Sequence, residues 1–265
     1  INLVDNMLGS AGKKQFSGDI DVAVQVDPDD IAAFGKKVQE SPLTLYFAKT
    51  SVFITKVKIQ NYDPKREEID PVTGESKGIP NGRTGYVQVD YMPGDPGWMK
   101  TYYHSPGEKE SKYKGVYRNI MIATMCALWE RESSEERTAD DRAMEVTRWI
   151  WSPSKGLVRI KRVPKPRADG NGYTKAHIDT DLQKPITNPD QIAKALGLNT
   201  GADLHSFETI HKAIKKNYKP ELYQKIIDSF AKNNVVKDIG IPDEIKNKVS
   251  KDDQELDRIK ELAGV

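Results

Sequence analysis

The sequence predicts an α+β protein in which a mixed β-sheet flanked by helices is followed by a mainly helical C-terminal region. Strand signals dominate from Val22 to Val89, where β-branched and apolar residues alternate with polar ones. Helical patterns begin near Lys114 and dominate after Gly172. We expect three regions, namely a core over 1–130, a helix with a basic strand and connector over 131–175, and a helical domain over 176–265.

Length and composition place the chain among globular proteins. Its 265 residues are 37% hydrophobic and 30% charged, which is enough to bury one large core or two modest ones. There is no run of about eighteen apolar residues and no signal-peptide pattern at the start, so we expect no membrane partner. The single cysteine, Cys126, lies in an apolar run and is expected to be a core residue in a reducing, cytoplasmic compartment.

In the first part of the chain, strands are expected over 52–59 and 86–92, with one helix over 31–39. Asp27 and Pro28 provide a helix-opening pattern before that helix. The polar segment between the two strands is rich in turn pairs and is interpreted as a long hairpin excursion.

Two further helices are expected over 114–131 and 135–151. Ser133 followed by Glu136 has the spacing of a capping box, which favours a helix start there. The segment 156–163 alternates apolar with basic residues, as a half-buried strand does.

Beyond Gly172 we expect only helices. Two of them are predicted to begin at Pro189, after Asn188, and at Pro220, after Lys219, because proline is favoured in the first helical turn.

Two carboxylates near the start of the chain carry the first functional signal. Asp19 and Asp21 alternate with Ile20 and Val22, so both carboxylates of a strand would point the same way, with Cα atoms about 6.5 Å apart. Such a pair repels unless a hard divalent cation lies between its oxygens, and the cation then leaves positions open for phosphate. We therefore expect a Mg²⁺ or Mn²⁺ site.

The residues before this pair suit a triphosphate. Glycines let backbone amides approach phosphate closely, and serine hydroxyls and a lysine reach its outer oxygens. The candidate nucleotide-binding residues here are Gly9, Ser10, Lys13, Ser17 and Gly18.

The order Gly-Ser, short basic loop and Ser-Gly-Asp-x-Asp resembles the signature of the nucleotidyltransferase superfamily of DNA polymerase β. Lys13 falls where those polymerases place a phosphate-binding arginine, although the loop after it is slightly shorter. The resemblance covers roughly the first 120 residues. It implies the family's mixed sheet, a divalent metal, and transfer of a nucleoside monophosphate from a nucleoside triphosphate such as ATP to an acceptor hydroxyl.

The resemblance also requires a third carboxylate on a neighbouring strand, and Asp90 is the best candidate because Val87 and Val89 alternate with it. By analogy, Asp90 binds the metal or accepts the proton of the attacking hydroxyl. The alternative is a strand-end aspartate that faces water.

Further phosphate contacts are suggested at Lys112, Lys114 and Arg118, near the start of the helix over 114–131. Packing of the helix is the competing interpretation for this segment.

The acceptor is the least determined part of the prediction. A basic stretch runs from Arg148 to Lys175, and its alternation puts Arg159 and Lys161 on one side, which suits the phosphates of RNA or DNA. A solvated strand face explains the same pattern. The alternatives left open are a small-molecule or protein acceptor, a non-catalytic nucleotide-binding module, and a metal-dependent nuclease or phosphatase.

Overall fold

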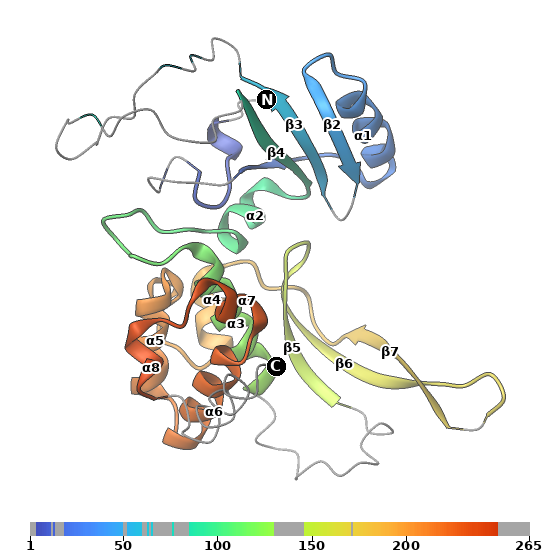
Figure 1. Ribbon diagram of the computed structural model, residues 1–265. Helices are drawn as coiled ribbons and strands as arrows, with labels where there is room; N and C mark the ends of the chain where they lie inside the picture. The colour runs from blue at the N-terminus through green and yellow to red at the C-terminus, as the bar shows by residue number, and fades with distance from the viewer. Residues whose placement is uncertain are drawn as a thin grey trace, which may run out of the picture. The chain divides into compact units, whose positions relative to one another are not determined.

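The computed structural model describes residues 4–11, 13, 19–49, 52–59, 63, 65, 76, 85–129, 146–170 and 172–248. The chain divides into two compact units, Ile1–Lys100 and Thr101–Val265, and each is treated on its own below. The sequence had placed the first boundary at residue 130. Both units combine strands with helices, which confirms the α+β class (Figure 1).

Four strands form a mixed sheet in the first unit, in the order β1-β4-β3-β2. β1 pairs with β4 in parallel, whereas β3 is antiparallel to both β4 and β2. The strands expected over 52–59 and 86–92 are confirmed, and most of the excursion between them lies outside the described residues. The bounds are β1 Ile20–Val24, β2 Thr44–Lys49, β3 Phe53–Lys58 and β4 Tyr86–Pro93, with 3-10 turns at Val4–Asn6 and Pro28–Asp30.

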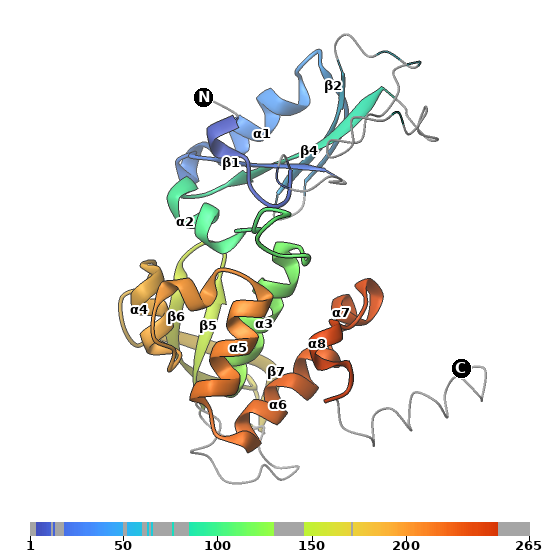
Figure 2. The same cartoon turned by 90° about the vertical axis from the view of Figure 1, so that its left-hand side faces the viewer.

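Helix α1 (Ile31–Gln39) has the predicted bounds and covers one face of this sheet (Figure 2). The ring centroid of Phe34 lies 5.7 Å from that of Phe53 and 6.1 Å from that of Tyr91. A Cβ atom on Gly35 would stand 2.6 Å from the Phe53 ring, so this glycine lets the helix approach the sheet closely.

In the second unit, α3 (Gly115–Leu128) packs against α5 (Phe207–Asn217), α6 (Pro220–Ala231) and the first strand of a second sheet. One side of α3 is deeply buried through Met121, Ile122 and Met125, and Cys126 is buried with them, which confirms the core assignment of that thiol. The other helical segments of this unit are α4 Pro189–Ala195, the 3-10 turn Gly201–Leu204, α7 Asn234–Ile239 and α8 Asp243–Lys246, while α2 (Pro96–Tyr102) includes the residues where the first unit ends and the second begins.

The second sheet is antiparallel and consists of β5 (Val146–Ser152), β6 (Gly156–Pro166) and β7 (Tyr173–Asp181). The basic strand expected over 156–163 is therefore confirmed as β6. The helix expected over 135–151 is wrong from residue 146 onwards, and its first part lies outside the described residues. β5 pairs along its whole length with β6, and this long-range pairing overrides the local helix signal.

The expectation of helices alone after Gly172 is also wrong, because β7 adds to the edge of β6. The two proline-based helix starts further on are confirmed. α4 begins at Pro189, where the Asn188 side chain accepts hydrogen bonds from the backbone amides of Asp190 and Gln191. α6 begins at Pro220.

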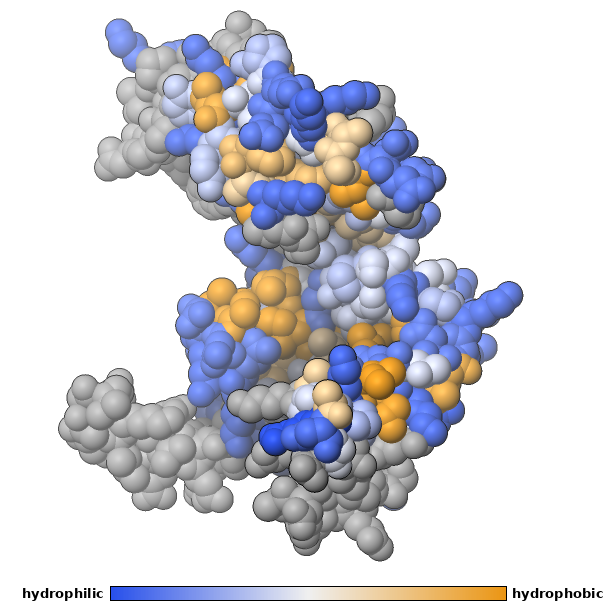
Figure 3. Space-filling view, turned by 90° about the vertical axis from the view of Figure 1, so that its right-hand side faces the viewer, coloured by the Kyte–Doolittle hydropathy of each residue, from blue (hydrophilic) through white to orange (hydrophobic). Residues whose placement is uncertain are grey.

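No helix in the described part of the chain combines the length and the apolar character that crossing a membrane requires. Hydrophobic residues at the surface occur in local patches, as Figure 3 shows for one face. In the first unit, large exposed apolar side chains lie around the edge strand β2, where Leu45 is 55% exposed.

Candidate active site

The parallel pairing of β1 with β4 places Asp21 directly beside Asp90, because the two residues are partners in the strand register. Asp19 lies immediately before β1 on the same chain segment. Each of the three carboxylates has an oxygen within 4.8 Å of an oxygen of the others. The structure thus brings together the three carboxylates that the sequence singled out.

Mutual repulsion and burial together make this cluster electrostatically unfavourable without a counterion. Burial, followed by the charges of Asp19 and Asp90, raises the pKa of Asp21 to about 6. Burial also raises the pKa of Asp90, although a hydrogen bond from Gln88 opposes the effect. Three close carboxylates are the donor set that a hard divalent cation prefers, so the residues present fit Mg²⁺ or Mn²⁺.

Gln88 is a site residue that the sequence analysis did not single out. Its side-chain Nε2 donates to both carboxylate oxygens of Asp90, at 3.0 Å and 3.2 Å. The two residues lie two positions apart on β4 and therefore share a face of the sheet. Gln88 fixes the orientation of the Asp90 carboxylate, and the signal that indicates it is this i, i+2 spacing.

The Gly-Ser segment lies against the same carboxylates. The backbone amide of Leu8 donates to the Asp21 carbonyl at 2.8 Å, and Met7 forms an antiparallel bridge with Val22. Gly9 has φ of 63°, and a Cβ atom there would lie 2.9 Å from Asp21 Oδ2. Only glycine combines this backbone conformation with so close an approach.

The predicted phosphate loop continues from Gly9 through a turn. The amide of Lys13 donates to the Ser10 carbonyl at 3.0 Å, and the Lys13 side chain is exposed. Ser10 follows the glycine that approaches the carboxylate cluster closely. Ser17 and Gly18 lie outside the described residues, so their predicted roles stay predictions.

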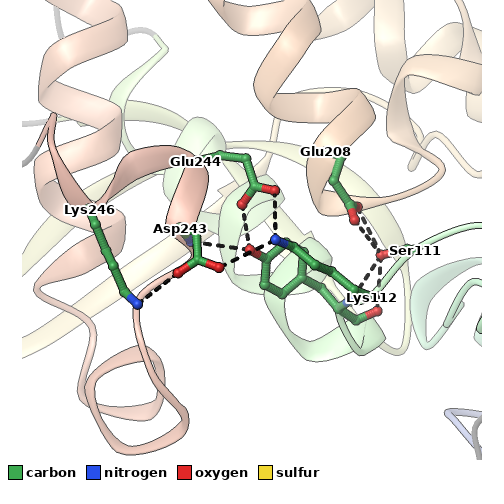
Figure 4. Close-up of polar contacts among 7 residues, drawn as sticks. Ser111, Lys112, Glu208, Asp243, Glu244 and Lys246 are labelled. Carbon is green, nitrogen blue, oxygen red and sulfur yellow. Dashed lines mark hydrogen bonds and ion pairs between the residues drawn. The ribbon is translucent and has the colours of Figure 1, made fainter.

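The other predicted phosphate ligands lie in the second unit. Lys112 forms ion pairs with Asp243 at 3.4 Å and Glu244 at 3.2 Å (Figure 4). Lys114 is exposed just before α3. These lysines stay candidates for phosphate contacts.

Arg118 differs from the two lysines because only 4% of it is exposed. Its guanidinium donates to the backbone carbonyls of Leu204 and Tyr102. Burial lowers its pKa to about 10. These contacts give Arg118 a place in the packing of the second unit, which is the competing interpretation that the sequence analysis named.

The basic stretch is partly neutralised within its own sheet. Arg162 makes two hydrogen bonds to Asp179 across the β6–β7 pair, and Lys155 pairs with Asp181 at 2.9 Å. Arg159 and Lys161 share one side of β6, as expected, and both are only partly exposed.

Comparison of the chain with protein-family models, with curated proteins and with solved structures found no match. The resemblance to nucleotidyltransferases therefore depends on the sequence motif.

Proposed function

We propose that this protein is a metal-dependent nucleotidyltransferase that moves a nucleoside monophosphate from a nucleoside triphosphate to an acceptor hydroxyl, with nucleic acid as the favoured acceptor. The observation that carries the proposal is the close approach of Gly9, where a Cβ atom would lie 2.9 Å from Asp21 Oδ2, to the Asp19–Asp21–Asp90 cluster. It joins a glycine suited to phosphate with carboxylates suited to a cation in one small site.

Each residue has a defined task in this proposal. Asp19, Asp21 and Asp90 would hold a divalent cation, which supplies positive charge for the phosphates when it is bound. The acceptor hydroxyl forms a bond to the α-phosphorus as the bond to pyrophosphate breaks. Asp90 takes the hydroxyl proton, a role for which a carboxylate beside the reacting hydroxyl is suited.

Ser10 and Lys13 serve the triphosphate. The Ser10 hydroxyl donates to a phosphate oxygen, and the Lys13 ammonium adds a charge-assisted hydrogen bond. Replacing Lys13 with Ala should weaken triphosphate binding by roughly 1.5–3 kcal/mol if the contact is desolvated, and replacing Ser10 with Ala should weaken it less. Unchanged affinity in Lys13→Ala would remove this lysine from the site.

The decisive experiment is a transfer assay. The protein is incubated with Mg²⁺ or Mn²⁺, with each α-labelled nucleoside triphosphate, and with separate pools of DNA, RNA, tRNA, small hydroxyl compounds and protein. Label should move to one acceptor class, and pyrophosphate should be released in equal amount. Asp19→Asn and Asp21→Asn should abolish transfer with the fold intact, whereas Asp179→Asn, on the other sheet, should retain it.

The alternatives give different results in the same assay. Triphosphate binding without any labelled product indicates a nucleotide-binding module. Loss of phosphate from the nucleic acid or the triphosphate, without transfer, indicates a nuclease or phosphatase. Full transfer by the Asp19→Asn/Asp21→Asn double variant would eliminate the proposed chemistry.

A further inference from the structure

The face of the first sheet that carries Asp21 and Asp90 continues across the outer strands. Strand register places Lys56 of β3 opposite Gln88 of β4, and Tyr46 of β2 opposite Lys56. Since cross-strand partners share a face, these residues form a row beside the row that contains the carboxylates.

A second row lies one step further from the carboxylates on the same face. Lys58 of β3 is the register partner of Tyr86 at the start of β4. Residues two apart on a strand share a face and are separated by about 6.5 Å. We call Tyr46, Lys56, Lys58 and Tyr86 together the outer-strand face.

The outer-strand face is open to a ligand. Tyr46 is 56% exposed and Tyr86 is 38% exposed, and both lysines are also exposed. α1 packs through Phe34 on the opposite side of the sheet, where Phe53 and Tyr91 lie. The covered and the open face are therefore clearly distinguished.

The charges of this face are not neutralised by described residues. No ion pair within the described part of the chain involves Lys56 or Lys58. Instead, the ammonium of Lys56 lies 5.1 Å from the centre of the Tyr86 ring. Exposed lysines interleaved with exposed aromatic rings suit phosphates and unstacked bases together.

We propose that the outer-strand face binds a single-stranded segment of a nucleic acid acceptor, with phosphates on Lys56 and Lys58 and bases stacked on Tyr46 and Tyr86. The rows lead along the sheet through Gln88 to Asp90, so a strand bound there can bring a terminal hydroxyl to the carboxylates. This inference rests on the proposed nucleotidyl transfer for its direction, but the binding surface itself is testable without catalysis.

Binding is measured by fluorescence anisotropy of labelled 12-nucleotide single-stranded DNA and RNA in EDTA, across a series of salt concentrations. With Lys56→Gln/Lys58→Gln, affinity should fall, and the log-log salt slope should become shallower by about 1.4, because each phosphate contact on a single strand contributes about 0.7. With Tyr46→Leu/Tyr86→Leu, affinity should fall about 5-fold or more per stacked base.

Matched variants make the result specific to this face. Lys36→Gln/Lys37→Gln removes the same charge from exposed positions of α1, so its salt slope should equal that of the parent. Tyr46→Phe/Tyr86→Phe keeps both rings and should keep the affinity. Arg159→Ser/Lys161→Ser/Arg162→Ser tests the basic strand of the other unit and should leave the slope unchanged.

Three outcomes would overturn the inference: equal binding by the parent and the Lys56→Gln/Lys58→Gln variant, an equal loss in the α1 control, or a loss confined to the β6 variant. Transfer to a small molecule without oligonucleotide binding would also overturn it while leaving nucleotidyl transfer in place. If the parent binds the oligonucleotide, the lysine variant does not, and the parent shows no transfer, the result would support the binding surface and contradict the proposed function.

Discussion

The two sheets place aspartates against opposite kinds of partner. In the first, Asp21 lies beside Asp90, and burial and like charges raise the pKa of Asp21 to about 6. In the second, Asp179 lies opposite Arg162, and hydrogen bonds from that guanidinium hold the pKa of Asp179 below its usual value. The same side chain is thus an electrostatic cost in one sheet and a stabilising partner in the other, and the costly arrangement is the one suited to a cation.

The largest expected difference between the sheets is their response to divalent metal. Mn²⁺ at about 100 times its dissociation constant should raise the free energy of unfolding of the first unit by about 2.7 kcal/mol, because the cation binds the folded carboxylate cluster. Urea denaturation in Mn²⁺ and in EDTA measures the effect.

The Asp19→Asn/Asp21→Asn variant should show no such response, and Asp179→Asn should respond as the parent does. An undiminished response in the double variant would place the metal elsewhere.

The next largest effect is that two matched substitutions should change the free energy of unfolding in opposite directions. In EDTA, Asp21→Asn should raise the free energy of unfolding by about 1–2 kcal/mol, a value reduced to allow for solvent screening of the partly exposed carboxylate. Asp179→Asn should lower it by about 0.5–1 kcal/mol, because Arg162 loses a charged partner. Urea denaturation of both variants compares them directly, and a loss of stability in Asp21→Asn would contradict the repulsion.

The sequence predicts the aspartate cluster of the first sheet but not the aspartate–arginine pair of the second. Asp19 and Asp21 share a short local motif. Asp90 was sought because the resemblance to nucleotidyltransferases implies a third carboxylate, and the regular alternation around it selected this residue. The pairing of Asp179 with Arg162 depends on β7, a segment for which the sequence predicts helix. Register between strands decides which charges meet, and short segments of sequence do not encode it strongly.

The errors in the fold have the same origin. The segment that became β5 contains Trp149 and Trp151, whose alternation is typical of a strand, but the capping-box pattern at Ser133 favoured a helix. Only pairing with β6, together with packing of Trp151 against α3, decides the outcome. Gln88 was missed although its i, i+2 spacing from the predicted Asp90 was available, because a glutamine on a strand face is not by itself a metal-ligating or catalytic residue.

Acid should affect the two sheets in opposite directions. The pKa of Asp21 is raised on folding, so in EDTA the folded state binds more protons than the unfolded chain between about pH 4 and pH 6, and the first unit should gain stability as pH falls through that window. The pKa of Asp179 is lowered, so its contribution is present above the unfolded pKa of about 4 and is lost as pH falls below it. Hydrogen exchange of β1 and β6 amides, corrected for intrinsic rates, follows each unit separately, and parallel pH profiles would contradict the comparison.

The smallest expected effects concern the lysines on the two sheets. Lys155 pairs with Asp181, but their side chains are 55% and 40% exposed, so Lys155→Gln should lower the free energy of unfolding by less than about 0.5 kcal/mol. Lys56→Gln should change it by no more than a similar amount, since Lys56 is exposed and its described neighbour is the Tyr86 ring. Urea denaturation therefore should not distinguish these variants, whereas oligonucleotide binding should, because only Lys56 lies on the outer-strand face. A large stability loss in Lys56→Gln would show that this lysine supports the sheet, and its effect on binding would then no longer indicate a direct phosphate contact.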